Sequence, residues 1–161
     1  MKEIQLTQGK VAIVDDGDYE YLNQWKWYYD HGYARRDKIR DKKKKRIYMH
    51  SFIMNTPAGM ETDHKDNDKP DHGLDNRRDN LRVATNAQNK MNKGKGIDNA
   101  SGYKGVHWDK RDNKWRATIS MENRKKSLGY FTDPIEAARA YDAAARLHHG
   151  EYASLNFPDG V

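Results

Sequence analysis

The segment from Lys90 to Ser101, KMNKGKGIDNAS, shows neither the helical nor the strand period of apolar residues, and it divides this chain into two parts. Its glycine, asparagine and lysine are typical of a linker. Of the 161 residues, 35% are hydrophobic and 34% are charged, which argues against one large core and for two small modules with much solvated surface. We therefore expect domains at residues 1–92 and 102–161, joined by a linker at residues 93–101.

The charge balance favours a polyanionic partner. Lysine and arginine total 30 against 24 acidic residues, a net charge of +6, and the sequence pI is about 9.3. Cations released from nucleic acid phosphates drive the association of such proteins with DNA or RNA. The aromatic content of 11% is too high for a disordered basic tail.

We expect neither a membrane-spanning segment nor a structural role for cysteine. No apolar run is long enough to cross a bilayer, and Met1 to Val14 mixes charges with apolar residues, unlike a signal peptide. We expect an intracellular, cytoplasmic protein without a membrane partner. The chain has no cysteine, which excludes disulfides and cysteine-ligated zinc.

The N-terminal part predicts a small aromatic core. Residues 4–14 indicate a hairpin with its turn at Gln8-Gly9. Residues 19–33 hold seven aromatic side chains, whose spacing suits a helix and whose WKWYY run suits a strand equally well. Residues 47–54 predict one or two buried helical turns.

Between these segments lies a strongly basic run. Arg35 to Arg46 reads RRDKIRDKKKKR and has almost no apolar content, so we expect a mobile loop or a long solvated hairpin tip. Such a run either keeps the protein in solution or serves as an arm that contacts phosphates. The sequence leaves both readings open.

The C-terminal part predicts a three-stranded antiparallel sheet packed on one helix. In Lys114 to Met121 the residues Trp115, Ala117, Ile119 and Met121 alternate with polar and basic ones, as in a strand with one buried face. Residues 103–108 and 125–131 supply flanking strands, with turns at 111–113 and 122–123. Asp133 caps a helix that has Pro134 in its first turn and stops at Gly150.

Residues 60–92 predict a strand, a loop, a second strand and a helix that Asn86 caps. This order would bring Asp63, His64, Asn80 and Asn89 into one cleft. Carboxylate and amide oxygens suit one Mg²⁺ or Mn²⁺ ion rather than zinc. An imidazole can take a proton from water at neutral pH, and Asn80 could fix its tautomer. The plainer alternative is turn chemistry, since Asn and Asp favour loops and caps.

These four residues resemble the HNH nucleases with a ββα-metal active site. The resemblance runs from about His50 to Asn92 and is carried by DH at 63–64, DNLR around Asn80, and Asn89. It implies that His64 is the general base, that Asn80 positions it, and that Asp63 and Asn89 bind the metal ion. The implied fold is α+β, with an N-terminal ββα-metal HNH domain.

Residues 101–158 resemble the plant Apetala-type, or ethylene-response-factor, DNA-binding domain. The markers YKGV, W-x-A-x-I, LGYF, AA-x-AYD and LNFP occur in that order. The resemblance implies that the sheet lies in the major groove of double-stranded DNA and that the helix supports it. The contact residues it implies are Lys104, His107, Arg111, Lys114, Arg116, Thr118 and Lys125.

Together the two resemblances predict a homing-type DNA endonuclease, a metal-dependent phosphodiester hydrolase whose sheet module adds affinity. One ββα site attacks one phosphodiester, so we expect a monomeric nickase without a small-molecule cofactor. The first alternative is a non-cleaving, sequence-specific transcriptional regulator in which the ββα segment is only a scaffold. The second is an RNA-binding or RNA-processing protein.

Overall fold

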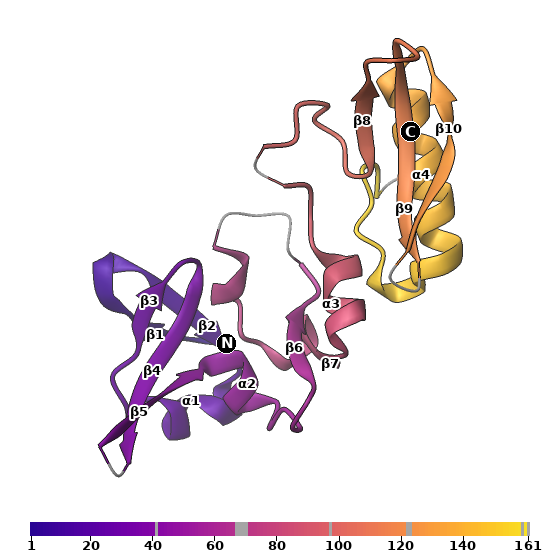
Figure 1. Ribbon diagram of the computed structural model, residues 1–161. Helices are drawn as coiled ribbons and strands as arrows, with labels where there is room; N and C mark the ends of the chain where they lie inside the picture. The colour runs from indigo at the N-terminus through magenta and orange to yellow at the C-terminus, as the bar shows by residue number, and fades with distance from the viewer. Residues whose placement is uncertain (41, 67–70, 97, 122–123, 159, 161) are drawn as a thin grey trace. The chain divides into compact units, whose positions relative to one another are not determined.

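A computed structural model describes residues 1–40, 42–66, 71–96, 98–121, 124–158 and 160 (Figure 1). The chain forms two compact units, Met1–Asn89 and Lys90–Val161. In the part of the chain so described, no helix is long and apolar enough to cross a membrane.

The first unit consists of short strands and helices around one core. Its elements are β1 (Lys2–Gln5), β2 (Val11–Val14), α1 (Asp16–Leu22), β3 (Tyr28–Asp30), β4 (Tyr33–Arg40), β5 (Lys43–Tyr48), α2 (Met49–Ile53), β6 (Glu61–His64), β7 (Leu81–Ala84) and the start of α3 (Asn86–Asn92). The strands pair as β1-β2, β3-β4-β5 and β6-β7, all antiparallel.

The predicted N-terminal hairpin is confirmed as β1 and β2. Gln8 and Gly9 form its turn with φ of +62° and +67°, a conformation that glycine adopts without strain. The ambiguous aromatic segment contains both element types, because α1 ends at Leu22 and β3 begins at Tyr28. Leu22 and Trp27 are buried in the core, as predicted.

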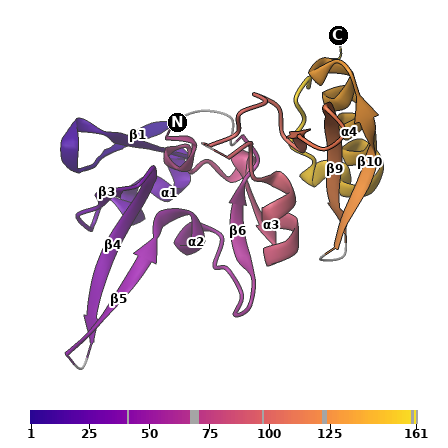
Figure 2. The same ribbon diagram turned by 45° about the horizontal axis from the view of Figure 1, so that its top comes forward.

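The basic run 35–46 lies in the two-stranded ribbon of β4 and β5. Both views show this ribbon projecting from the rest of the first unit (Figures 1 and 2). Its base is anchored, since Ala34 is fully buried and the Arg36 guanidinium lies 4.2 Å from the Trp25 ring centroid. The hairpin reading of this run is therefore the correct one.

The strand, loop, strand, helix order predicted for residues 60–92 is present as β6, β7 and α3, but its cap differs. The helix is capped by Thr85: its hydroxyl accepts from the Gln88 backbone N–H at 3.2 Å, and the Gln88 side chain accepts from the Thr85 N–H at 2.8 Å. This reciprocal pair is a capping box. The predicted cap, Asn86, instead donates to Glu61.

The second unit is the predicted three-stranded antiparallel sheet with one helix. The strands β8 (Val106–Asp109), β9 (Lys114–Met121) and β10 (Arg124–Phe131) lie in the order β10-β9-β8, and α4 spans Pro134–His149. Figure 2 shows α4 against one face of this sheet. Asp133 accepts from the Ile135 N–H at 2.9 Å, which confirms the helix cap. The turn predicted at 122–123 lies outside the described residues.

The buried face of this sheet follows the predicted alternation. Ala117 and Ile119 on β9 are buried, and they pack with Tyr141 and the small alanine side chains of α4. Alanine lets helix and sheet approach closely at little conformational cost. The opposite face of the sheet is left to polar and basic side chains.

Candidate nucleic-acid interface

The exposed face of the β8-β9-β10 sheet is set by strand register. Residues directly opposite one another in antiparallel strands project on the same side. The rows on the exposed side pair Asp109 with Lys114, His107 with Arg116 and Tyr130, Thr118 with Ser127, and Ser120 with Lys125. We call this set of residues the sheet face.

Arg116 lies at the centre of the sheet face. Its guanidinium carbon is 5.5 Å from the Tyr130 ring centroid, and its Nε donates to the Ser127 hydroxyl at 3.2 Å. This bond to Ser127 occupies Nε and leaves the two terminal guanidinium nitrogens of Arg116 able to donate to a ligand. A guanidinium held in this way can donate two parallel bonds to guanine O6 and N7.

His107 is the neighbour of Arg116 across the strand pair. Partial burial, together with the positive charges of Arg116 and Lys125, lowers the pKa of His107. The imidazole is therefore neutral at pH 7 and offers one donor and one acceptor. A neutral ring suits a base edge or a phosphate reached through its N–H.

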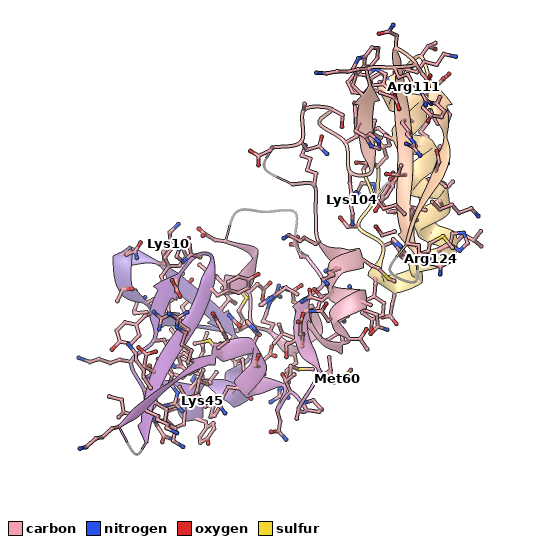
Figure 3. The ribbon with its side chains drawn as sticks, viewed as in Figure 1. Lys10, Lys45, Met60, Lys104, Arg111 and Arg124 are labelled. Atoms are coloured by element: carbon pink, nitrogen blue, oxygen red, sulfur yellow. The ribbon has the colours of Figure 1, made fainter. Side chains whose placement is uncertain are left out.

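The other predicted contact residues fall into two groups. Lys114 and Lys125 are exposed and Thr118 is half-buried, all three on the sheet face. Arg111 is exposed in the β8–β9 turn, where it pairs with Asp112 at 3.1 Å. Figure 3 places Arg111 at one end of the sheet and Arg124 at the other, so cations flank the sheet face at both ends.

Lys104 lies before β8 and is partly engaged inside its own unit. Its ammonium group donates to the Met91 carbonyl oxygen and lies 5.8 Å from the Tyr141 ring centroid. Its backbone N–H also donates to Asn156 at 2.7 Å. An ammonium group has three N–H donors, so the bond to Met91 does not by itself prevent Lys104 from binding a phosphate.

Sequence alternation did not identify Tyr130 as part of the sheet face. A bulge between Ser127 and Gly129 turns Leu128 and Gly129 both toward the helix side, so that Ser127 and Tyr130 share the exposed side. Gly129 has φ of +140°, a conformation that favours glycine in a bulged strand. A glycine inside a strand pattern is the sequence feature that could have predicted this bulge.

The four residues of the predicted metal cleft each have a different partner. Asp63, buried on β6, accepts from Arg82 Nε at 2.9 Å and is ion-paired with the same guanidinium. His64, the next residue, has its ring 4.9 Å from that of His50 and 6.0 Å from that of Tyr33, measured between centroids. Successive strand residues point to opposite faces, which accounts for these different surroundings.

Asn80 organises the loop that follows His64. Its side-chain oxygen accepts from the Asp66 N–H and its amide donates to the Asp75 carbonyl, both at 3.0 Å. Its backbone carbonyl accepts from the Lys65 N–H at 2.8 Å. These are the turn bonds that asparagine ordinarily makes in loops.

Asn89 on α3 donates from its amide to the Glu61 carboxylate. In the described residues, no group of three or more histidine, aspartate or glutamate side chains could hold a metal ion. A divalent ion at Asp63 would have to displace the Arg82 guanidinium, so this donor set fits one poorly. Binding of Mg²⁺ or Mn²⁺ by Asp63 and Asn89 stays a prediction.

Comparison with known proteins identifies one relative that matches more than half of the chain and others that match a shorter part of it. The chain is 31% identical over 97 residues to protein 3.8 of Escherichia phage T7, which covers 60% of this chain and 76% of that protein. The chain belongs to the family of protein 3.8. Within this member of the family, residues 101–150 match the AP2 domain. No solved structure matches.

Plant proteins match the AP2 domain of this family member. The ethylene-responsive transcription factor ERF024 of Arabidopsis thaliana is 47% identical over 62 residues, 37% of this chain and 33% of that protein. The dehydration-responsive element-binding protein 2D of the same plant is 46% identical over 69 residues, 41% of this chain and 33% of that protein. The chain thus spans about a third of the length of these plant relatives.

These comparisons confirm the Apetala-type domain and overturn the endonuclease prediction. The named plant relatives are transcription factors and element-binding proteins, and the matches include no nuclease family. The predicted homing endonuclease and its hydrolase class are therefore wrong, and the HNH domain is not supported. The physical reason is visible in the contacts, because the aspartates and asparagines make ion pairs and turn bonds. No comparison tests the roles predicted for His64 and Asn80, which stay predictions.

Proposed function

We propose that the chain is a sequence-specific, non-cleaving binder of double-stranded DNA that acts as a regulator of transcription. The observation that carries the proposal is the sheet face, with Arg116 held between Tyr130 and Ser127 and cations at both ends of the sheet. Relatives named as transcription factors support it.

In this proposal the sheet face lies in the major groove, whose width admits β-strands and whose base edges differ for every base pair. Arg116 is placed to read a base edge, with His107 and Thr118 beside it. Lys114, Lys125, Arg111 and Lys104 bind phosphates and fix the register. The β6–β7–α3 segment serves as scaffold.

Selection from a random duplex library, followed by binding to the selected site and to a scrambled duplex at stated salt, tests the proposal. The full chain should prefer the selected site by about 10³-fold or more. Equal binding of both duplexes, or tighter binding of structured RNA, would contradict it.

Two variants separate base reading from phosphate binding. Arg116→Lys keeps the charge but loses the planar fork, so it should reduce the preference for the selected site by about tenfold or more. Lys125→Gln should weaken binding to both duplexes equally. It should also reduce the salt slope, the slope of the logarithm of the binding constant against the logarithm of the salt concentration, by about 1 in magnitude. A uniform effect of Arg116→Lys would assign that residue to phosphate instead.

A further inference from the structure

The β4–β5 ribbon has two faces of different charge. In antiparallel pairing Lys38 lies directly opposite Lys45, and Asp37 lies directly opposite Arg46. Because side chains alternate between faces, Lys38, Lys43 and Lys45 project on one side. We call these three residues the lysine face.

On the other side of the ribbon, the carboxylate of Asp37 offsets part of the positive charge of Arg35, Lys44 and Arg46. Asp37 pairs with Lys44 at 2.9 Å and with Arg35 at 2.8 Å. The hydrogen bond from Lys44, with Arg35 and Arg46 nearby, lowers the pKa of Asp37. The cations on this side thus have an internal counter-charge.

The lysine face has no such counter-charge among the described residues. All three side chains are exposed, and no described carboxylate is paired with them. Like charges directly opposite one another destabilise a strand pair. The ribbon keeps this unfavourable arrangement on a rigid base, where Arg36 packs over Trp25 and Ala34 is buried. Figure 3 labels Lys45 on this ribbon.

We propose that the lysine face is a second DNA-contacting surface, which binds backbone phosphates of the duplex without reading its sequence. The inference rests on the proposed function, because it assigns the first unit a share in binding the same duplex. A pre-formed ribbon with unneutralised cations on one side loses little entropy on binding and releases condensed counterions from DNA.

The test compares two double variants of the full chain with the same change in charge. Lys38→Gln/Lys45→Gln removes the opposed pair of the lysine face, and Lys44→Gln/Arg46→Gln removes two cations from the side that carries Asp37. The first should weaken binding to a scrambled duplex by at least about fivefold and reduce the salt slope by about 2. The second should change both much less.

Two further readouts separate contact from folding. Lys38→Arg/Lys45→Arg should bind like the wild type, since the charges remain. The melting temperature of Lys38→Gln/Lys45→Gln should equal or exceed that of the wild type, because the repulsion is gone. Preference for the selected site should not change in any of these variants.

The outcomes distinguish this inference from the proposed function. If the wild type binds duplex DNA but the two glutamine variants lose affinity equally, or not at all, the lysine face is not a contact surface. If the wild type prefers an RNA duplex and Lys38→Gln/Lys45→Gln removes that preference, the surface belongs to RNA. If the wild type does not bind duplex DNA, the proposed function itself fails.

Discussion

Gly105 packs against the ring of Tyr141 so closely that a Cβ atom at this position would lie 2.1 Å from the ring carbon Cδ2. Its φ of +77° also disfavours any other residue. The start of β8 can approach α4 in this way because position 105 has no side chain.

Gly105→Ala should therefore destabilise the second unit by about 3–4 kcal/mol, the sum of overpacking and backbone strain. Gly102→Ala is a matched control, since Gly102 has φ of +76° but nothing within 4 Å of its Cβ position, and it should cost about 1 kcal/mol. Denaturant unfolding measures both. Equal losses would mean that contact with Tyr141 is unimportant.

The buried carboxylate of Asp142 holds the segment after α4. It accepts from the Asn156 N–H at 2.8 Å, from the Asn156 amide at 3.0 Å and from the Phe157 N–H at 2.8 Å. Asp142→Ala leaves these donors without their acceptor and should cost about 2–4 kcal/mol. In a double-mutant cycle, Asn156→Ala should add much less in the Asp142→Ala background than alone. Additive losses would contradict the coupling.

Tyr130 supports the Arg116 guanidinium on the sheet face. Tyr130→Ala should weaken binding to the selected duplex by about 2- to 10-fold, because a partly exposed cation–π contact contributes about 0.5–1 kcal/mol and the ring also orients Arg116. Tyr28→Ala, which removes a similarly exposed tyrosine from the first unit, should leave the affinity within twofold. Fluorescence anisotropy titrations measure both, and equal effects would rule out the supporting role.

Burial and the nearby His64 lower the pKa of His50 to about 3. In the unfolded chain a histidine titrates near 6.5, so between these values the unfolded state binds more protons. Stability is therefore present above pH 6.5 and is lost as the pH falls toward 3, by about 2 kcal/mol between pH 7 and pH 5. His50→Phe keeps a ring beside Tyr48 and should flatten this part of the pH dependence.

The free energy of unfolding at pH 7, 6 and 5 checks the His50 prediction. His148→Gln replaces an exposed histidine and serves as the control. If His50→Phe shows the same loss between pH 7 and pH 5 as the wild type, then other groups account for the acid sensitivity.

Asp63→Asn tests whether Asp63 is a partner of Arg82 or a metal ligand. The side chains are 5% and 10% exposed, and removing one member of a buried ion pair costs about 3–5 kcal/mol. We expect that loss, together with a wild-type melting temperature that neither 5 mM Mg²⁺, Mn²⁺ nor a chelator changes by more than about 1 °C. A rise in the wild type with either ion, absent in Asp63→Asn, would instead support a metal site.

Local patterns determined most of the second unit. Asp133, Pro134 and Gly150 set both ends of α4, because capping and backbone preferences act within a few residues. The alternation of Ala117 and Ile119 with polar neighbours identified the buried face of β9, since a strand with one packed face requires that period.

Tertiary structure decided what the polar residues of the first unit do. The sequence places Asp63, His64, Asn80 and Asn89 in an order that resembles a metal site. In the structure, however, Asp63 forms an ion pair with Arg82, and Asn89 donates a hydrogen bond to Glu61. The position of a guanidinium 19 residues away depends on strand register, which spacing does not encode. In the same way, a bulge placed Tyr130 beside Arg116, and cross-strand pairing gathered Lys38 and Lys45 on one side. Sequence fixes local conformation, whereas long-range pairing decides which charges meet.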